Sequence, residues 1–264
     1  MARLAFVLAA LGLLVGVLGA CSGCSKEPAP AGGAAAGEVQ EEKEDEAPPP
    51  PTTQGPPGRV HGKTRLEGKA PAPATFAITE PVCQEHHKTI ASEEIVASPD
   101  GALANVLVHV KNAPAGGPPP AEPVVIDQKG CQYVPHAVAV QRGQRLVMRS
   151  SDAVLHNVHS YPKKSPVQNL AMTPGSAERE LVFKQPEIGI RIACDVHPWM
   201  GAVVHVLKHS SFALTGADGA YAIAGLPPGR YTIEAVHEKL GTKTQTIDLA
   251  PGGDAELDFA FEVK

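Results

Sequence analysis

The chain has 264 residues, 43% hydrophobic and 19% charged, and its 26 glycines and 26 prolines argue against a helical bundle or coiled coil. The net charge is −5, but from Gly58 onward 21 acidic residues face 20 basic ones, so this part lacks the positive surface of a nucleic-acid-binding protein. Neither a P-loop nor a G-x-G-x-x-G sequence occurs, and we expect no nucleotide ligand.

Residues 1–20 have the pattern of an export signal: Arg3 precedes a fifteen-residue apolar run that is short for a membrane span. The run ends in Leu18-Gly19-Ala20-Cys21, which resembles the lipobox of bacterial lipoproteins. The resemblance implies that Cys21 is lipidated and, with Ser22 after it, that the protein is anchored at the periplasmic face of the outer membrane. The alternative is an ordinary secretory signal, and both readings place the protein in an oxidising compartment.

Residues 21–57 are rich in alanine, proline, glycine and glutamate, and they include the charged run 41–46. Such a segment buries too little apolar surface to fold. We therefore expect a disordered tether that holds a folded head away from the membrane.

The rest of the chain predicts an all-β protein. Turn signals such as Asp218-Gly219 and Pro227-Pro228-Gly229 separate short runs of alternating or branched apolar residues, which is typical of β-sandwiches. A short helix is expected only near residues 85–92. The expected strands are 105–111, 134–140, 145–150, 180–184, 189–194, 202–207, 221–224, 231–237 and 255–263.

Two short segments carry side chains that bind soft metal ions. A loop between two expected strands contains Cys194, His197 and Met200 at a spacing of three residues, so one turn can direct a thiolate, an imidazole and a thioether to one point. The other segment contains His156 and His159. One of these imidazoles would complete the ligand set of a type 1 copper site.

Strand alternation distinguishes the two histidines of the second segment, because neighbouring residues point to opposite faces. We expect His156 to reach the metal and His159 to lie on the surface. We also expect His197, which is in a loop, to lie nearer to solvent than His156.

Residues 119–208 resemble the cupredoxin family, in particular its amicyanin-like and plastocyanin-like members. The family has a His-Asn pair after a strand, a Cys-x-x-His-x-x-Met loop, and an opening similar to Tyr133-Val134-Pro135. The resemblance implies one copper ion held by four ligands, with Asn157 supporting them and an exposed ligand ring as the electron exit. Trp199 departs from the family pattern, which has a smaller aromatic residue there. The implied ligands are His156, Cys194, His197 and Met200.

Less specific interpretations remain open for the same residues. A Cys-x-x-His pair also binds zinc, although zinc sites rarely use methionine. A buried cysteine without any metal is usually a small hydrophobic residue.

Two further cysteines of the predicted head, Cys83 and Cys131, have no role in this site. In an exported domain they are expected to form a disulfide. The alternative is a second metal or redox site formed by Cys131 and His136.

The flanking segments resemble the carboxypeptidase regulatory-like (transthyretin-like) β-sandwich. The resemblance rests on Gly58–Gly62, Ala104–Val108, the Asp218-Gly219 turn and the Pro227–Tyr231 turn. It implies a discontinuous sandwich of residues 58–118 and 209–264, with the cupredoxin domain inserted at 119–208. A cupredoxin followed by an unrelated C-terminal hairpin unit is the alternative.

These observations predict a lipid-anchored type 1 copper protein that exchanges electrons with envelope redox proteins, such as a cytochrome c or a dehydrogenase. We expect a monomer and not an enzyme, because no nucleophile–base pair stands out and four ligands leave no open metal position. The alternatives are copper storage, delivery or sensing, and a surface carbohydrate-binding or adhesion module.

Overall fold

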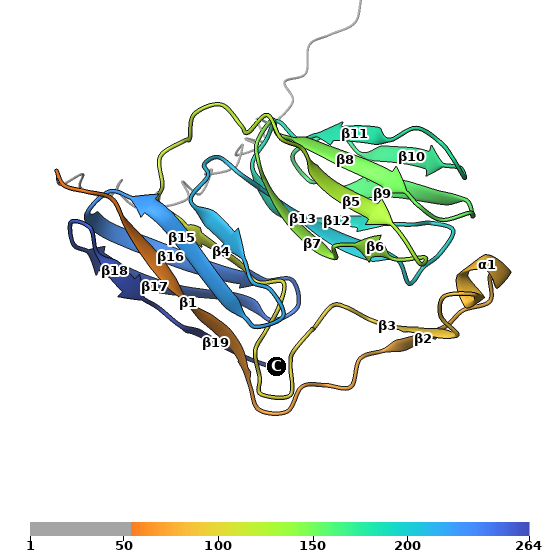
Figure 1. Cartoon of the computed structure of the whole chain (residues 1–264), viewed down its shortest axis with the longest axis horizontal. Helices are drawn as coiled ribbons and strands as arrows, with labels where there is room; N and C mark the ends of the chain where they lie inside the picture. Colours follow the sequence, from red (N-terminus) through yellow and green to blue (C-terminus); the bar gives the residue numbers. More distant parts are fainter. Residues whose placement is uncertain (1–53, 264) are drawn as a thin grey trace, which may run out of the picture. The chain divides into compact units, whose positions relative to one another are not determined.

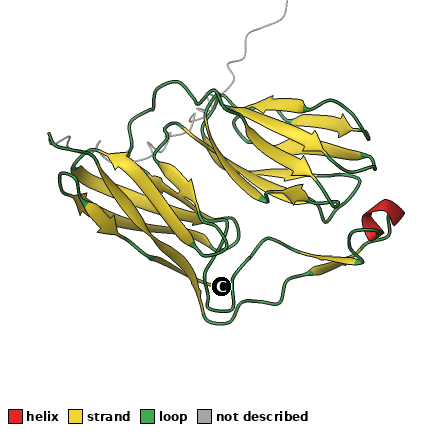
Figure 2. Ribbon diagram, in the orientation of Figure 1, coloured by secondary structure: helices red, strands yellow, loops and turns green. Residues whose placement is uncertain are grey.

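The structure is a computed structural model that describes residues 54–263. It is all-β apart from the four-residue helix α1 (Pro81–Gln84), as Figure 2 shows, and the predicted fold class is confirmed. The predicted export signal, Cys21 and nearly all of the tether lie outside the described residues. Between residues 54 and 263, no helix has the length and apolar character needed to cross a membrane.

Residues 124–207 form a sandwich of two sheets (Figure 1). One sheet has the strand order β10-β9-β12-β13-β7 and the other β11-β8-β5-β6. β7 runs parallel to β13 and β5 parallel to β8, while the other pairs are antiparallel, so this is the cupredoxin-like Greek-key arrangement. The strands are β5 (Val124–Gln128), β6 (Tyr133–Val134), β7 (Ala137–Gln141), β8 (Arg145–Ser150), β9 (His156–Tyr161), β10 (Gln168–Met172), β11 (Arg179–Val182), β12 (Glu187–Ala193) and β13 (Gly201–Leu207).

The core of this sandwich follows from strand alternation. Ile190 and Ile192 of β12 are fully buried and Arg191 between them is exposed, because successive side chains point to opposite faces of a sheet. Met148 of β8 and Val158 of β9 belong to the same buried cluster. The outer face of the five-stranded sheet is therefore left for polar side chains.

The flanking segments form two further sheets. One contains β15, β1 and β18 in that order, with β19 also paired to β1, and the other has the order β14-β4-β16-β17. The strands are β1 (Gly58–Glu67), β4 (Leu107–Val110), β14 (Phe212–Leu214), β15 (Ala220–Leu226), β16 (Gly229–His237), β17 (Gly241–Leu249), β18 (Asp254–Glu256) and β19 (Phe259–Glu262).

Strands that precede residues 119–208 pair with strands that follow them. β1 is antiparallel to β15, and β4 is antiparallel to β16 with Val108 opposite Ala235. A discontinuous sandwich requires such pairs. The local sequence explains β16: the Pro227-Pro228-Gly229 turn precedes it, and Tyr231, Ile233 and Ala235 alternate into the core.

A small hairpin lies between β1 and β4 in the chain. β2 (Thr75–Ala77) pairs with β3 (Thr89–Ala91), and α1 lies between them. The helix predicted near residues 85–92 is wrong, because Pro81 at the first turn starts the helix earlier and Ile90 pairs with Phe76 as a strand residue. We call residues 75–91 the cap segment.

The cap segment is covalently attached to the cupredoxin-like sandwich. Cys83 of α1 forms a disulfide with Cys131, which precedes β6. This confirms the predicted pairing. Both cysteines are fully buried.

A prediction concerns Glu234 on β16. His109 Nε2 lies 3.2 Å from one carboxylate oxygen and Lys111 Nζ 3.1 Å from the other. The hydrogen bond from His109, opposed by burial and assisted by Lys111, lowers the pKa of Glu234 to about 2. The ionised carboxylate therefore stabilises the fold fully above the unfolded pKa of about 4.3. This contribution is lost as the pH falls towards 2.

Glu234→Gln should lower the free energy of unfolding at pH 7 by about 2 kcal/mol, as is typical of hydrogen bonds to charged groups. The difference between variant and parent should shrink below pH 4. Denaturant unfolding of the copper-free protein from pH 7 to pH 2 measures both quantities. A difference that stays constant over this range would contradict the assigned ionisation.

Candidate metal centre

The loop between β12 and β13 is closed by its own backbone. The Cys194 N–H donates to the Met200 carbonyl at 3.2 Å, and the Met200 N–H donates to the His197 carbonyl at 2.9 Å. Pro198 restricts the chain between these two bonds. Cys194 and Met200 are buried in one apolar cluster, so the loop is a fixed part of the core.

Three of the four predicted ligands converge. His156 Nδ1 lies 2.9 Å from His197 Nδ1, and Cys194 Sγ lies 3.7 Å from the same nitrogen. The three donor atoms all lie within 4.8 Å of one another. β9 turns His156 to the inside, where it is fully buried, and His159 to the outside, with 22% of its side chain exposed. Met200 lies at the end of the loop, buried in the cluster that also contains Cys194.

The expected difference in exposure between His197 and His156 is very small. Only 2% of His197 is exposed, little more than the fully buried His156. Cys83 Sγ lies 3.9 Å from His197 Nε2, so the cap segment covers the ring edge that faces away from the other ligands. A loop position did not predict exposure here, because the covering residue is more than a hundred positions away in the sequence.

Asp152 is a residue of this site that the sequence did not reveal. Its Oδ2 lies 3.0 Å from His156 Nε2, and its carboxylate accepts hydrogen bonds from the N–H groups of Gly130 at 2.7 Å and Cys131 at 2.8 Å. A carboxylate in this position holds the proton on Nε2 and leaves the Nδ1 lone pair for a metal. The only sequence signal is an aspartate four residues before His156, which is too common to indicate this role.

Burial and hydrogen bonding shift the pKa values of the three converging ligands in different directions. Burial raises the pKa of the Cys194 thiol, but hydrogen bonds from His156 and from nearby backbone N–H groups outweigh it, and the net pKa is lowered. Burial and the charge of His156 lower the pKa of His197. Metal binding requires a deprotonated thiol and imidazoles with a free lone pair, and the shifts at Cys194 and His197 favour both. Burial lowers the pKa of His156, but its hydrogen bonds to Asp152 and Cys194 outweigh this and the net pKa is raised, so a metal ion competes with a proton at this ring.

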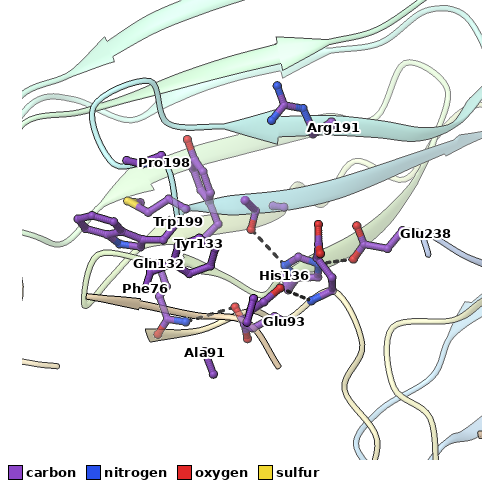
Figure 3. A pocket seen from close by; sticks show the side chains of 16 residues that line it. Phe76, Ala91, Glu93, Gln132, Tyr133, His136, Arg191, Pro198, Trp199 and Glu238 are labelled. Carbon is purple, nitrogen blue, oxygen red and sulfur yellow. Dashed lines mark hydrogen bonds and ion pairs between the residues drawn. The ribbon is translucent and has the colours of Figure 1, made fainter. Parts of the chain in front are cut away.

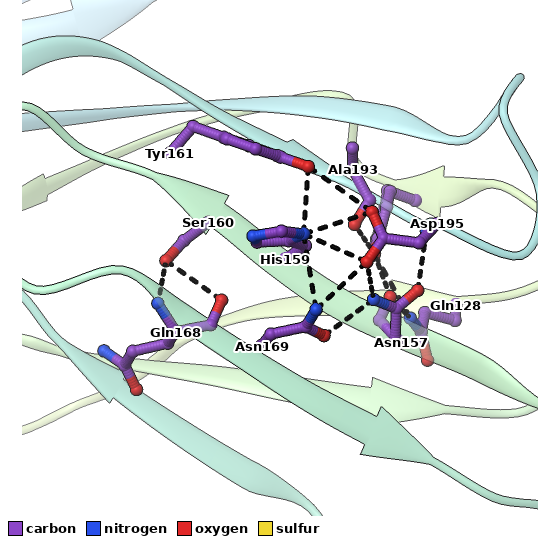
Figure 4. Close-up of polar contacts among 10 residues, drawn as sticks. Gln128, Asn157, His159, Ser160, Tyr161, Gln168, Asn169, Ala193 and Asp195 are labelled. Atoms are coloured by element: carbon purple, nitrogen blue, oxygen red, sulfur yellow. Dashed lines mark hydrogen bonds and ion pairs between the residues drawn. The ribbon is translucent and has the colours of Figure 1, made fainter.

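Asn157 joins the two ligand-bearing segments. Its Oδ1 accepts a 2.6 Å hydrogen bond from the Asp195 N–H, and its Nδ2 donates to the Asp195 carboxylate at 2.7 Å (Figure 4). The Tyr133 hydroxyl donates to the Asn157 carbonyl at 2.6 Å. These bonds fix the residue after His156 against the residue after Cys194.

Trp199, which departs from the family pattern, packs on the covered side of the site. Its ring centroid lies 5.1 Å from that of His197, and its Nε1 donates to the Cys131 carbonyl at 3.0 Å. The large indole thus connects the loop to the disulfide.

A second site from Cys131 and His136 is ruled out by the disulfide. His136 instead lies 3.1 Å from the Gly201 carbonyl through Nδ1 and 2.5 Å from Glu238 through Nε2 (Figure 3). Among residues 54–263, the other group with metal-binding atoms in reach is Cys131, Asp152 and His156, which shares His156 and contains the disulfide-bonded sulfur.

Comparison with known proteins gives one family match. Residues 195–262 match the model of the Carboxypeptidase regulatory-like domain, which is less than half of the chain. The match begins in the loop between β12 and β13 and continues through β19. A search of the curated proteins gives no match.

Several solved structures are similar to about a third of this chain. A purple cupredoxin from Nitrosopumilus maritimus is 22% identical over 31% of this chain and 98% of its own, with a TM-score of 0.27. A mutant amicyanin in its reduced Cu(I) form is 22% identical over 34% of this chain and 91% of its own, with a TM-score of 0.30.

The copper-containing nitrite reductase from Thermus scotoductus is 17% identical over 32% of this chain, with a TM-score of 0.29, and the match spans 22% of its length. The sheet order and the family match together describe an all-β chain with a cupredoxin-like sandwich and a region similar to carboxypeptidase regulatory-like domains.

Proposed function

We propose that this protein is a type 1 copper protein that transfers single electrons. The observation that carries the proposal is the convergence of His156 Nδ1, His197 Nδ1 and Cys194 Sγ within 4.8 Å in a buried site. Two imidazoles and one thiolate, with a buried methionine at the end of the same loop, form the donor set typical of blue copper. Zinc sites rarely include methionine, so the set favours copper.

Copper bound by His156, Cys194, His197 and Met200 would supply a one-electron change between Cu(II) and Cu(I). The chain supplies rigidity: the loop bonds, Asp152 and Asn157 each fix one ligand-bearing segment. Ligands that barely move on oxidation or reduction keep the rearrangement small.

The proposal extends to the location of the protein. Lipidated Cys21 and the tether of residues 21–57 would anchor the folded head at the periplasmic face of the outer membrane. The partners would be envelope redox proteins, such as a cytochrome c or a dehydrogenase, encountered by a monomeric carrier. The support for this part is the lipobox-like sequence and the disulfide, which suits an oxidising compartment.

Copper titration of the purified full-length protein tests the proposal. We expect one equivalent of Cu(II) to produce an intense band at about 600 nm. Ascorbate should bleach the band and an oxidant should restore it. Tight binding of Cu(I) without this band would favour storage or delivery, and glycan binding by the copper-free protein would favour adhesion.

A prediction concerns Asp152, whose carboxylate contacts Nε2 of His156, so that one imidazole ring would separate it from a copper ion held by Nδ1. Asp152→Asn removes a charge that favours Cu(II) over Cu(I), so the reduction potential should rise. A unit charge about 7 Å away in an effective dielectric of 20 is worth about 2 kcal/mol, or roughly 30-fold in the Cu(II)/Cu(I) equilibrium.

Spectroelectrochemistry measures this shift. Asp127→Asn is the matched control, because Asp127 lies on β5 and accepts a hydrogen bond from Ser151 instead of from a ligand. A potential that is unchanged in Asp152→Asn, with the band intact, would show that this carboxylate does not act on the ion.

A further inference from the structure

One side of the site is closed by the cap segment. Cys83 Sγ lies 3.9 Å from His197 Nε2, and the disulfide attaches Cys83 to Cys131. Phe76 and Ala77 of β2 lie along the same groove as His197 and Trp199. Only 2% of His197 is exposed. A partner that approaches the Nε2 edge of this ring therefore meets the cap segment and not the ring itself.

The opposite side of the site continues directly into polar side chains. Asp195 follows Cys194 in the chain and Asn157 follows His156, so each is one residue from a ligand. Their mutual hydrogen bonds of 2.6 and 2.7 Å join both ligand-bearing segments (Figure 4). These contacts lie on the outer face of the five-stranded sheet.

The polar network extends from Asp195 to the surface. His159 Nδ1 lies 3.0 Å from the Asp195 carboxylate and 2.9 Å from the Tyr161 hydroxyl (Figure 4). The His159 and Tyr161 rings stack at 4.2 Å, and Arg191 Cζ lies 4.1 Å from the Tyr161 ring centroid. The Asp195 side chain is 46% exposed, so the network ends in solvent.

We propose that electrons enter and leave through this surface, which we call the Asp195 patch (Asn157, His159, Tyr161, Asn169 and Asp195), and not through His197. Electron tunnelling weakens steeply with distance and with gaps between atoms. The patch offers covalent bonds from Cys194 to Asp195 and then short hydrogen bonds, whereas the His197 edge lies behind the cap segment. This inference rests on the proposed function, and it identifies the face of the protein through which electrons would be exchanged.

The patch suits a one-electron redox protein that docks briefly. Its groups are polar or flat and aromatic, and transient electron-transfer complexes bury small surfaces. A lasting interface would instead require an extensive apolar core.

Charge substitutions at two matched alanines test the proposed exit. Ala171 is exposed and lies opposite Asn157 in the β9–β10 pair, so it borders the patch. Ala77 is exposed on β2 beside the groove that ends at His197. Each is changed to lysine and to glutamate, and the reduced copper protein is oxidised by hexacyanoferrate(III) in a stopped-flow instrument.

Because the oxidant is an anion, Ala171→Lys should raise the second-order rate constant and Ala171→Glu should lower it, each by roughly threefold at low ionic strength. High salt should remove the difference. Ala77→Lys and Ala77→Glu should leave the rate constant unchanged. A response at position 77 equal to or larger than that at position 171 would overturn the proposal.

A second measurement does not depend on copper. Diethyl pyrocarbonate is added to the copper-free protein and modified histidines are identified by mass spectrometry. His86 and His87 are exposed and should react, whereas His197 should react at least tenfold more slowly. Equal reactivity of His197 would show an open ligand edge and overturn the proposal. Failure of the proposed function would instead be seen as a missing band near 600 nm.

Discussion

Replacing Cys194 by serine should abolish the copper–thiolate band and weaken Cu(II) binding by more than about 100-fold, because loss of an outer supporting contact alone costs 10–100-fold. The band is a charge transfer from sulfur to copper, and a serine hydroxyl offers no equivalent. Cys194 is 2% exposed and lies in a loop closed by backbone bonds, so the smaller, similar side chain leaves the loop in place. Absorption spectra and a copper titration by equilibrium dialysis give the two quantities.

His159→Ala is the matched control. This residue lies on the same strand as His156 but on the opposite face, where its ring contacts Asp195 and Tyr161. The alanine variant should retain the full band intensity. A band that survives Cys194→Ser, or one that is lost in His159→Ala, would reject the ligand assignment.

The local chemistry of the site could be predicted from the sequence. Cys194, His197 and Met200 share one short loop, so their spacing alone brings them together. Alternation along a six-residue strand then distinguished His156 from His159, because a strand has only two faces. Both inferences depend on contacts within a few residues of the chain.

The surroundings of the site could not be predicted in the same way. His197 is covered by Cys83, 114 positions away, and a local pattern carries no information on such a contact. The exposed ligand ring that the family resemblance implies is therefore not seen at this residue. The carboxylate of Asp152 contacts His156 and is held by the N–H groups of Gly130 and Cys131, and this arrangement depends on how two loops meet beside β9.

The helix expected near residues 85–92 shows that short local elements were also hard to predict from the sequence. Its residues are compatible with a helix, but the strand pairing of Ile90 with Phe76 and the start at Pro81 decide the local structure. Tertiary pairing outweighs a weak local propensity in so short a segment. An error at one such segment does not change the predicted fold class, because that prediction depends on many turns and alternating runs at once.

Removing the disulfide, with Cys83→Ala and Cys131→Ala together, should lower the free energy of unfolding by about 4 kcal/mol, the chain-entropy value for a loop of roughly 50 residues. The separation of the two cysteines is 48 residues. Such a loss corresponds to a fall in Tm of about 10 °C for a domain of this size. Urea unfolding of the parent and the double variant measures the difference. The double variant avoids the unpaired buried thiol that either single variant would leave.

The same double variant should keep the copper–thiolate band but make His197 more reactive. Neither cysteine is a predicted ligand, so the band near 600 nm should remain. The cap segment then keeps only its non-covalent contacts over His197, and modification of this ring by diethyl pyrocarbonate should become at least severalfold faster than in the parent. A loss below about 1 kcal/mol, with His197 as protected as before, would mean that packing alone holds the cap segment in place. A loss of the band would mean instead that the disulfide positions the ligands, since Trp199 and Asp152 both bind the backbone of residue 131.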